Sequence, residues 1–460
     1  MPAPGLNEPG RLTRFLGRAP GGVFVAYAVV ASFGAYFCMY AFRKPFAAAL
    51  FAGESFAIDA LELKSAIVIS QVLGYALSKY VGIRVCSELP PRYHPLTLVG
   101  LIVWAELSLL LFAELPGSWK TLAIFLNGLS LGMVWGLVVR FLEGRVTSEL
   151  LLAGLSCSFI VSSGIVKDAG RAMMSGAAAE WWGRVPILGN FVEGWMGRVS
   201  ESWMPAITGL HFLPFFVLFV WMLAQLPRRT DVDIEQRQAR ASMDGAKRLA
   251  FLREYLPGLV MLVGAYFLLT AYRDFRDNFS VEIFEALGYP YAGNETIITQ
   301  AESLVALGVI STLGLLNLVR RSRPGLIATF AVMAGGTALL GVSTLLLQAE
   351  LISGFWWMTL IGLGSYLAYV PYGSLLFERL MANSAIVGTA VFAIYLADAV
   401  GYTGSVAMLL YKDLAASEVS RLVFFQQATW AMAGFGTLLL LTSCVYFLGP
   451  KSSAGAEPPE

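Results

Sequence analysis

The chain is poor in charged residues and in the residue types that build metal sites. Of its 460 residues, 14% are charged, whereas an ordinary soluble protein carries about 25%. It has four cysteines, none in a C-x-x-C pair, and two histidines. The cysteines lie in or beside apolar segments, so we interpret them as small buried side chains rather than as disulfide partners or metal ligands. The net charge of +1 argues against a nucleic-acid partner.

Recognisable catalytic machinery is also scarce. The sequence contains no phosphate-binding P-loop. The two isolated histidines, His94 and His211, offer no nucleophile–base pair and no cluster of metal ligands. We therefore expect a protein that is not an enzyme and that needs no cofactor or metal.

Long apolar stretches fill most of the chain. It is 57% hydrophobic, with 46 glycines and 13% aromatic residues, as in packed membrane helices. About 20 apolar residues cross a bilayer as a helix. On that measure we predict twelve spans, at residues 21–52, 64–83, 95–115, 119–142, 147–168, 204–226, 256–273, 297–319, 325–348, 353–377, 384–410 and 422–448. The first is longer than one crossing needs, and we expect Pro45 to bend it.

The spans divide into two sets of six. The longest polar stretch lies between them, so we predict an N-terminal half at 1–227, a cytoplasmic linker at 228–255 and a C-terminal half at 256–460. Lys and Arg gather on alternate connections, which places both termini in the cytoplasm. The tryptophan-rich segment 169–203 is expected to be an outer loop lying on the membrane interface. The predicted fold is an all-α integral membrane protein with two pseudo-symmetric halves.

An arginine motif occurs once in each half. Tyr36-Phe37-x-x-x-Ala41-Phe42-Arg43 returns as Tyr266-Phe267-x-x-x-Ala271-Tyr272-Arg273, 230 residues later and so half of the 460-residue chain away. An arginine inside a span is costly, and its planar fork of donors suits phosphate or carboxylate. The repeat predicts a shared anion site on a pseudo-two-fold axis, with hydroxyl donors from Tyr40 and neighbouring tyrosines.

The two arginines do not have equal surroundings. The sequence stays apolar beyond Arg43, which favours anion binding over a place at the interface. Arg273 is followed at once by Asp274, Arg276 and Asp277, so an ion pair is as good an interpretation as a solute contact. Three further cations are candidates for the same site: Lys44, Arg276 and Lys79. Lys79 could instead snorkel to the cytoplasmic interface, and Lys167 with Arg171 is expected to form a solvated rim.

Two acids inside spans could serve ion coupling. Glu302 lies in the eighth span and Asp398 in the eleventh. Either carboxyl could exchange a proton in each cycle, or could bind an arginine or a neighbouring helix. For Asp398 we favour a structural role, because Gly401 and Gly404 indicate a tight helix contact beside it. For Glu302 both interpretations stay open.

Charged pairs also close the fourth and tenth spans. Glu143 and Arg145 follow one, and Glu378 and Arg379 follow the other. We expect these residues to latch the two halves together at a cytoplasmic gate.

Several fragments resemble the major facilitator superfamily and, within it, the organophosphate:phosphate antiporters. They are Arg43-Lys44-Pro45-Phe46-Ala47-Ala48, the segment 74–80 with Lys79, the segment 132–136 with Arg140 downstream, and Arg273. The resemblance implies twelve helices and a phosphate-binding pair, Arg43 and Arg273. The chain departs from the pattern at residues 82–88, where the family's Gly-x-x-x-Asp-Arg loop is degraded, and at Ser162 and Ser163, where the antiporters have a histidine.

Together these features predict a secondary active transporter. Its solute would be a small organic anion, a phosphate ester or a carboxylate, carried across a bacterial inner membrane by alternating access. The expected partners are this solute, the lipid bilayer and a coupled proton or phosphate, and we expect a monomer. The alternative is a transporter-like sensor that binds an anionic ligand and signals to a partner, in which residues 228–254 would form the partner-binding surface.

Overall fold

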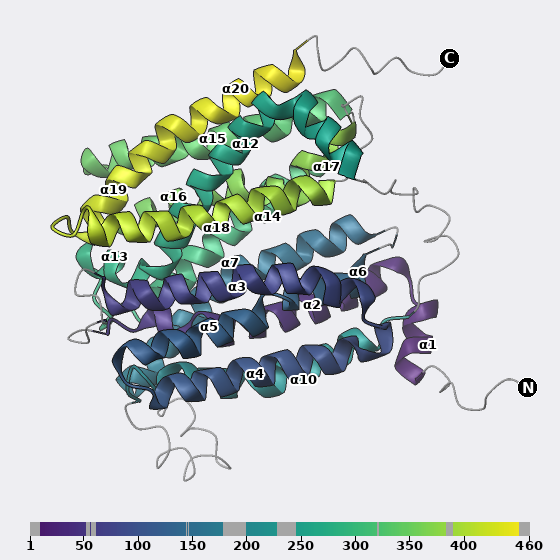
Figure 1. The fold of residues 1–460 in the computed structure, drawn as a ribbon, viewed down its shortest axis with the longest axis horizontal. Coiled ribbons are helices and arrows are strands. Elements are labelled where there is room, and N and C mark those ends of the chain that lie inside the picture. The colour runs from purple at the N-terminus through teal and green to yellow at the C-terminus, as the bar shows by residue number, and fades with distance from the viewer. Residues whose placement is uncertain are drawn as a thin grey trace, which may run out of the picture.

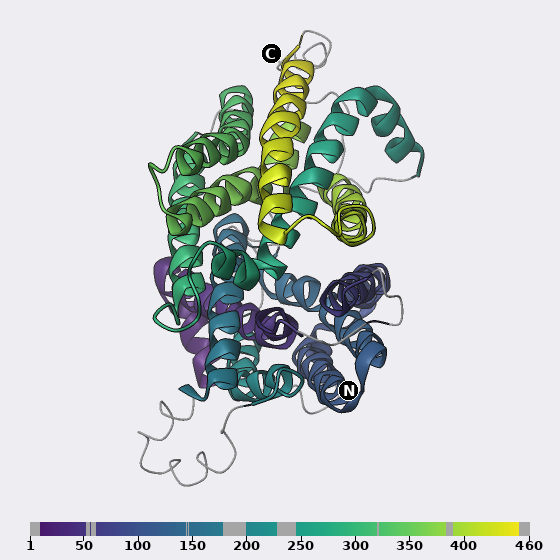
Figure 2. The same ribbon diagram turned by 90° about the vertical axis from the view of Figure 1, so that its left-hand side faces the viewer.

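The computed structural model describes residues 10–51, 56, 61–143, 145, 147–177, 199–227, 245–319, 322–382 and 390–449. Every element that these residues form is a helix. The helices form two bundles that lie side by side in both views (Figures 1 and 2), one drawn purple to blue and the other teal to yellow. This arrangement confirms the predicted all-α fold with two halves.

The first bundle contains the elements up to residue 224. They are α1 (Arg11–Arg18), α2 (Gly21–Arg43), η1 (Pro45–Ala48), α3 (Leu63–Glu88), η2 (Pro91–Tyr93), α4 (His94–Glu114), η3 (Gly117–Trp119), α5 (Lys120–Leu131), α6 (Val134–Leu142), α7 (Ser148–Ser175) and α10 (Met204–Ala224). The second bundle contains α12 (Gly245–Asn278), α13 (Ser280–Ala286), α14 (Ile297–Leu318), α15 (Ser322–Gln348), α16 (Gly354–Ser374), α17 (Leu376–Ala382), α18 (Ala390–Leu414), α19 (Arg421–Ala431), η4 (Met432–Gly436) and α20 (Thr437–Leu448).

The two ends of the molecule can be told apart in Figure 1. Helix α1 and the last turns of α20 lie at the same end, which we call the terminal end. Helix α13 lies at the opposite end, which we call the distal end. An even number of crossings brings the first and last elements to one side, so this placement agrees with twelve spans.

In the described residues, each of the twelve predicted spans coincides with one of these helices or with two or three consecutive ones. Residues 384–389 of the eleventh span lie outside the described residues. Among the described residues, eight helices are long and apolar enough to cross a membrane by length and composition. The four predicted spans outside that set are α3, α7, α16 and α18. Three of them, α3, α7 and α18, carry charged side chains that form ion pairs or hydrogen bonds between the bundles.

The expected bend after Arg43 is present. Helix α2 ends at Arg43, and Pro45 begins the short 3₁₀ helix η1. Proline has no N–H to continue the helix and disfavours helical geometry at the residue before it, and Lys44 has φ −113° and ψ −9°. The repeat in the second bundle has no proline at the matching place, and α12 continues to Asn278.

Glycines bring helices of one bundle into close contact. A Cβ atom on Gly128 of α5 would lie 2.4 Å from the backbone oxygen of Gln71 in α3. A Cβ on Gly404 of α18 would lie 2.7 Å from the backbone oxygen of Phe267 in α12, and one on Gly401 would meet Thr270 at 2.8 Å. The tight contact expected at Gly401 and Gly404 is therefore confirmed.

Three predicted features fall partly outside the described residues. These are most of the outer loop at 169–203, most of the linker at 228–255, and the side chain of Glu378 in α17. Helix α7 continues to Ser175, and α12 begins at Gly245, so part of each predicted connection is helical.

Candidate functional site

The end of α2 is held by two buried amides. A helix that ends inside a bundle leaves its last carbonyl groups without partners. Asn127 Nδ2 of α5 donates to the Phe42 carbonyl oxygen at 2.9 Å, and Gln71 Nε2 of α3 donates to the Arg43 carbonyl oxygen at 2.9 Å. Gln71 Nε2 also donates to Asn127 Oδ1 at 2.9 Å, which links the two amides. This network fixes the place from which the Arg43 side chain extends.

The guanidinium group of Arg43 lies against aromatic rings. Its Cζ is 4.3 Å from the centre of the Tyr75 ring and 5.6 Å from that of Tyr40. Among the described residues, no acid is close enough to form an ion pair with it, and its Nε is buried without a hydrogen-bond partner. A cation–π contact stabilises a charge without neutralising it. Within the part of the chain that the structure describes, Arg43 therefore presents an uncompensated positive charge and an unbonded Nε–H donor.

Arg273 has similar aromatic contacts but also a carboxylate partner. Its Cζ is 4.1 Å from the centre of the Tyr369 ring and 5.9 Å from that of Tyr366. Its Nη2 lies 2.7 Å from Asp274 Oδ1, and Asp274 Oδ2 accepts a hydrogen bond from Ser405 at 2.7 Å. The charge of Arg273 is thus largely compensated. The Arg273 neighbour Tyr369 stacks on Tyr266 with ring centres 5.3 Å apart, and the Tyr266 hydroxyl binds Asp398. Lys79, which pairs with Asp398, lies 5.4 Å from the ring centre of the Arg43 neighbour Tyr75, so the two arginines share one region of the molecule.

A series of aromatic rings connects the surroundings of the two arginines. Consecutive ring centres are 5.7, 4.8, 6.3 and 6.2 Å apart along the sequence of contacts Tyr40, Tyr36, Trp135, Phe159 and Tyr366. The first four rings belong to the first bundle and the last belongs to the second. We call these five residues the aromatic wall.

Lys79 binds an acid of the opposite bundle. Its Nζ lies 2.6 Å from Asp398 Oδ2, and the Tyr266 hydroxyl donates to Asp398 Oδ1 at 2.5 Å. The side chains of Lys79 and Asp398 are 20% and 17% exposed, so this pair stays in contact with solvent. Tyr75 and Tyr402, whose ring centres are 5.8 Å apart, cross the same boundary. The structure thus brings Lys79, Asp398 and the Arg43 neighbour Tyr75 together.

Arg276 and Glu302 form a pair inside the second bundle. Arg276 Nη1 lies 2.7 Å from Glu302 Oε1, both side chains are 2% exposed, and Arg276 Nη2 donates to the Met358 carbonyl oxygen at 2.9 Å. Tyr272 also faces inward there, with its hydroxyl 3.2 Å from that of Thr429. These contacts of Tyr272 and Arg276, the neighbours of Arg273 in sequence, are all with residues of the second bundle.

Asp277 is the centre of the polar contacts that join the bundles near the distal end. Its Oδ2 lies 2.6 Å from Lys44 Nζ and its Oδ1 lies 2.9 Å from Lys167 Nζ. Ser163 Oγ also donates to Oδ1. Both lysines belong to the first bundle, so one carboxylate of the second bundle binds two cations across the boundary.

Further contacts join the bundles around Asp277. Lys64 Nζ lies 2.5 Å from Glu282 Oε1, and the Thr299 N–H donates to Asp168 Oδ2 at 2.8 Å. Arg421 pairs with Glu62 at the same end. We call the contacts of Asp277, Glu282 and Asp168 the distal latch. Lys79 comes fifteen residues after Lys64 in α3, or about 22 Å along a helix, so the Lys79–Asp398 pair lies well away from the latch.

The solvated rim predicted for Lys167 and Arg171 is wrong. Their side chains are 0% and 4% exposed, and Lys167 is bound to Asp277. The prediction placed both residues at the end of a span, whereas α7 continues for two turns beyond Lys167.

The residues proposed for a cytoplasmic gate have contacts within their own bundles. Arg140 Nη1 lies 2.6 Å from Glu143 Oε1, and Arg145 Nη2 donates to the Pro227 carbonyl oxygen at 2.8 Å. Arg379 donates to the carbonyl oxygens of Gly325 at 2.7 Å and Leu316 at 2.8 Å. In this conformation, these contacts hold connections of one bundle in place.

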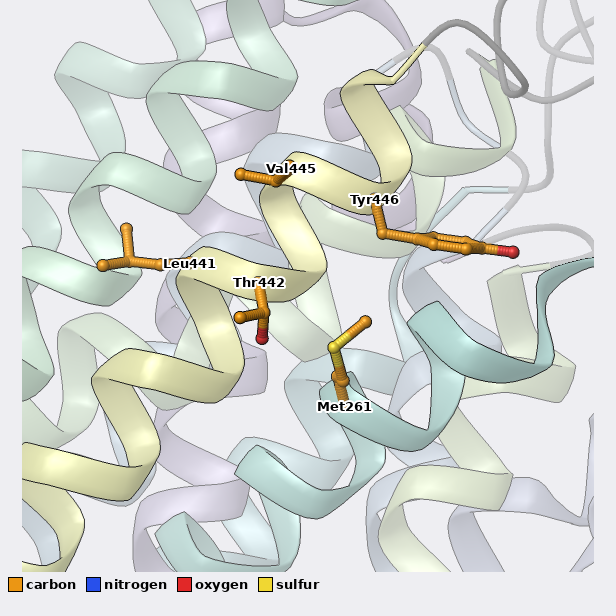
Figure 3. A pocket seen from close by; sticks show the side chains of 5 residues that line it. All are labelled: Met261, Leu441, Thr442, Val445 and Tyr446. Atoms are coloured by element: carbon orange, nitrogen blue, oxygen red, sulfur yellow. The ribbon is translucent and has the colours of Figure 1, made fainter.

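An apolar groove between α12 and α20 lies apart from the polar contacts described above. Figure 3 shows the side chains that line it, Met261, Leu441, Thr442, Val445 and Tyr446. Its volume is about 460 Å³. Val445 is 73% exposed on the outer face of the bundle, where a bilayer would cover it. Among the described residues, no group of three or more His, Cys, Asp or Glu side chains is placed to hold a metal ion.

The comparisons with known proteins identify a family and a fold. A model of a family of unknown function, DUF5690, matches residues 45–449. No curated protein sequence matches the chain. A crystal structure of a D-xylose-proton symporter is similar with a TM-score of 0.59 and 13% identity, covering 94% of this chain and 98% of that one.

Two more solved structures show the same fold. A nucleoside transporter, NupG, has a TM-score of 0.57 and 13% identity over 92% of this chain and 99% of its own. A POT family transporter in complex with 5-aminolevulinic acid has a TM-score of 0.54 and 12% identity over 94% and 97%. The chain therefore has a fold of the major-facilitator type over nearly its whole length.

Proposed function

The chain belongs to DUF5690, a family of unknown function, and we propose that it is a secondary transporter of a small organic anion, a phosphate ester or a carboxylate. In this proposal the halves 1–227 and 256–460, joined by the linker 228–255, move against each other around the solute. The observation that carries the proposal is the uncompensated charge of Arg43 beside the boundary between the bundles.

A partly buried cation without a counter-ion among the described residues needs an explanation. Desolvating a charge costs several kcal/mol unless it is paired. The other arginines near Arg43 have acid partners, Asp274 for Arg273 and Glu302 for Arg276. A solute anion that binds in this place would supply the missing partner. The Tyr75 and Tyr40 rings contact the guanidinium group, which restricts where its fork of donors can lie before the anion arrives.

The contacts between the bundles suit alternating access. Those near the distal end are ion pairs and hydrogen bonds, centred on Asp277 and Glu282, and such contacts can exchange for water when the bundles separate. The similarity to three transporter structures supports movement of this kind. With both termini in the cytoplasm of a bacterial inner membrane, the distal latch would close the outer side.

The proposal gives different roles to the candidate residues. Arg43, Tyr40 and Arg273 contact the solute, and Lys79 with Asp398 forms a pair that responds to it. Arg276 and Glu302 brace the second bundle, and Lys44 belongs to the latch. Four residues at the terminal end form the gate of the opposite conformation: Glu143, Arg145, Glu378 and Arg379. A proton or phosphate is the proposed coupled ion.

Binding and flux measured on Arg43 variants test the proposal. Purified protein is screened by thermal shift against carboxylates, phosphate esters, neutral sugars and organic cations, and uptake of the stabilising solute is then followed in proteoliposomes. Arg43→Gln should raise the Kd about 10- to 150-fold, because hydrogen bonds to charged groups contribute about 1.5–3 kcal/mol. Arg43→Lys should recover part of the loss, since it restores the charge but not the fork.

Arg92→Gln is the matched control, because Arg92 is exposed at the surface and should leave binding and uptake unchanged. Stabilisation by neutral sugars or cations alone would refute the anion proposal. Binding that depends on Arg43 with no flux under any gradient would point to the sensor instead of the transporter.

A further inference from the structure

We infer that the solute carries a single negative charge, on a carboxylate, together with a flat ring. The inference rests on the proposed function and narrows it to one class of anion. Its two parts come from separate observations, the charges near Arg43 and the aromatic wall.

The charge balance near Arg43 leaves one cation unmatched. Three pairs are closed, with N–O distances of 2.7, 2.6 and 2.7 Å: Arg273–Asp274, Lys79–Asp398 and Arg276–Glu302. Arg43 is the fourth cation of this group and has no acid partner among the described residues. A monoanion would therefore neutralise the site.

The excess charge of the distal latch does not change this balance. Lys44 and Lys167 share the single carboxylate of Asp277. Lys167 is 0% exposed and donates to Asp277 Oδ1, the Asp277 carbonyl oxygen and Ser280 Oγ, at 2.9, 2.8 and 2.9 Å. Lys44 is 5% exposed and also donates to Asn278 Oδ1 at 2.9 Å. Both ammonium groups are buried, and each is bound to the Asp277 carboxylate and to at least one further acceptor, so a solute at Arg43 does not pair with them in this conformation.

A phosphate monoester does not fit this balance. It carries a charge of about −1.5 to −2 at pH 7, because its second pKa is about 6. Only one of these charges would meet a free cation at Arg43, and the rest would be desolvated without a counter-charge. A carboxylate carries one charge and two oxygens, which match the guanidinium fork.

The aromatic wall supplies the second part of the inference. Its rings run from Tyr40, 5.6 Å from the Arg43 guanidinium, to Tyr366, 5.9 Å from that of Arg273. Trp135 and Phe159 lie between them. Aromatic faces bind other flat apolar faces by stacking. Trp135 and Phe159 are the partly exposed rings of the wall, whereas Tyr36, Tyr40 and Tyr366 are 5% exposed or less. A carboxylate held at Arg43 would place the body of the solute towards Trp135 and Phe159, which favours an aromatic ring or the flat face of a sugar.

Matched solutes separate the charge from the ring. We would measure Kd by calorimetry at pH 7.5 for phenylacetate, phenyl phosphate, glucuronate, glucose 6-phosphate, butyrate and glucose. For at least one of the two ring carboxylates, the Kd should be at least about tenfold lower than that of the phosphate ester with the same ring. It should also be at least about tenfold lower than the Kd of butyrate. Binding of phenylacetate would indicate that the solute contains an aromatic ring, and binding of glucuronate would indicate that it contains a sugar ring. Arg43→Gln should raise the Kd of whichever carboxylate binds.

Lowering the pH provides an independent check on charge. Between pH 7.5 and 5.5 the monoanionic fraction of phenyl phosphate rises about 25-fold, given a second pKa of about 6. If only the monoanion binds, its apparent affinity should rise by about that factor relative to phenylacetate. Trp135→Leu tests the contact with the ring of the solute. It should raise the Kd of the ring carboxylate and leave the Kd of butyrate unchanged.

The outcomes distinguish this inference from the proposed function. If phosphate esters bind as tightly as the matching carboxylates and their binding depends on Arg43, the inference of a single negative charge is refuted. The proposed transport of an anion is not affected by that result. If butyrate binds as tightly as the ring carboxylates, the inference that the solute contains a flat ring is refuted. Binding of glucose with no anion binding at all would overturn the proposed function itself.

Discussion

Asp277→Asn should shift the protein towards a conformation that is open at the distal end. The carboxylate binds Lys44 and Lys167 of the opposite bundle, whose side chains are 5% and 0% exposed. An asparagine keeps the shape but removes the charge that both lysines share. The two ammonium groups would then be buried without a counter-ion for as long as the latch stays closed.

The size of the shift can be worked out from the burial of the pair. Removing one partner of a buried ion pair costs about 3–5 kcal/mol, and most of that cost disappears when the bundles separate and water reaches the lysines. A cost of about 3 kcal/mol changes the equilibrium between the two conformations about 150-fold. If the distally open state is populated at about 1%, within the usual range for a minor state, it should rise to about 60%.

Distance measurements between spin labels would detect this change. Trp119 and Leu351 are 64% and 71% exposed at the distal ends of the two bundles, and cysteines placed there can be labelled after the four native cysteines are replaced. Asp277→Asn should increase the population with the longer distance. Glu302→Gln is the control, because Glu302 also lies at the boundary, against Gly164 of α7, but both members of its ion pair belong to the second bundle and stay together when the bundles separate. It should lower the Tm without changing the distances.

An unchanged distance distribution for Asp277→Asn, together with a lower Tm, would refute the reasoning. It would mean that Asp277 stabilises both conformations equally, as a residue inside one bundle would. A shift of similar size in Glu302→Gln would also refute it, since loss of any buried charge would then be enough to separate the bundles.

The helices and their division into two sets could be predicted because apolar length is a local property. Each of the twelve predicted spans is mainly helical in its described residues, and the end of α2 falls at Arg43 because Pro45 acts on its immediate neighbours. The close approach of α18 to α12 was also visible, since Gly401 and Gly404 remove side chains from one helix face. Such features depend on residues within a few turns of one another.

Partners of charged residues could not be predicted in the same way. Lys44 and the neighbouring residues of α12 that hold it are more than 230 positions apart in sequence. Four charges follow one another from Arg273 to Asp277, and the sequence shows them as one crowded group. On a helix, neighbouring residues point about 100° apart. Arg276 therefore faces Glu302 inside its bundle, while Asp277 faces Lys167 in the other bundle.

The amides that hold Arg43 were missed for a related reason. Gln71 and Asn127 are single polar residues in apolar segments, and nothing near them in sequence needs a donor. The carbonyl groups they satisfy belong to a helix broken by Pro45. A signal did exist, because a proline that ends a helix within a membrane leaves carbonyls that some other helix must satisfy. Mid-span amides are the natural donors.

Two further variants test how Arg43 is held and why it differs from Arg273. Asn127→Leu leaves the Phe42 carbonyl oxygen without a donor, so thermal unfolding in detergent should show a loss of about 1–3 kcal/mol; an unchanged Tm would mean that water replaces the amide. Asp274→Asn removes the acid partner of Arg273 and gives the site a second uncompensated cation. Phenyl phosphate should then gain about tenfold in affinity over phenylacetate at pH 7.5. An unchanged ratio of the two Kd values, for phenyl phosphate and phenylacetate, would mean that the shape of the site and not its charge balance selects the anion. Asp274→Asn alters the charge of the site and hardly alters its shape.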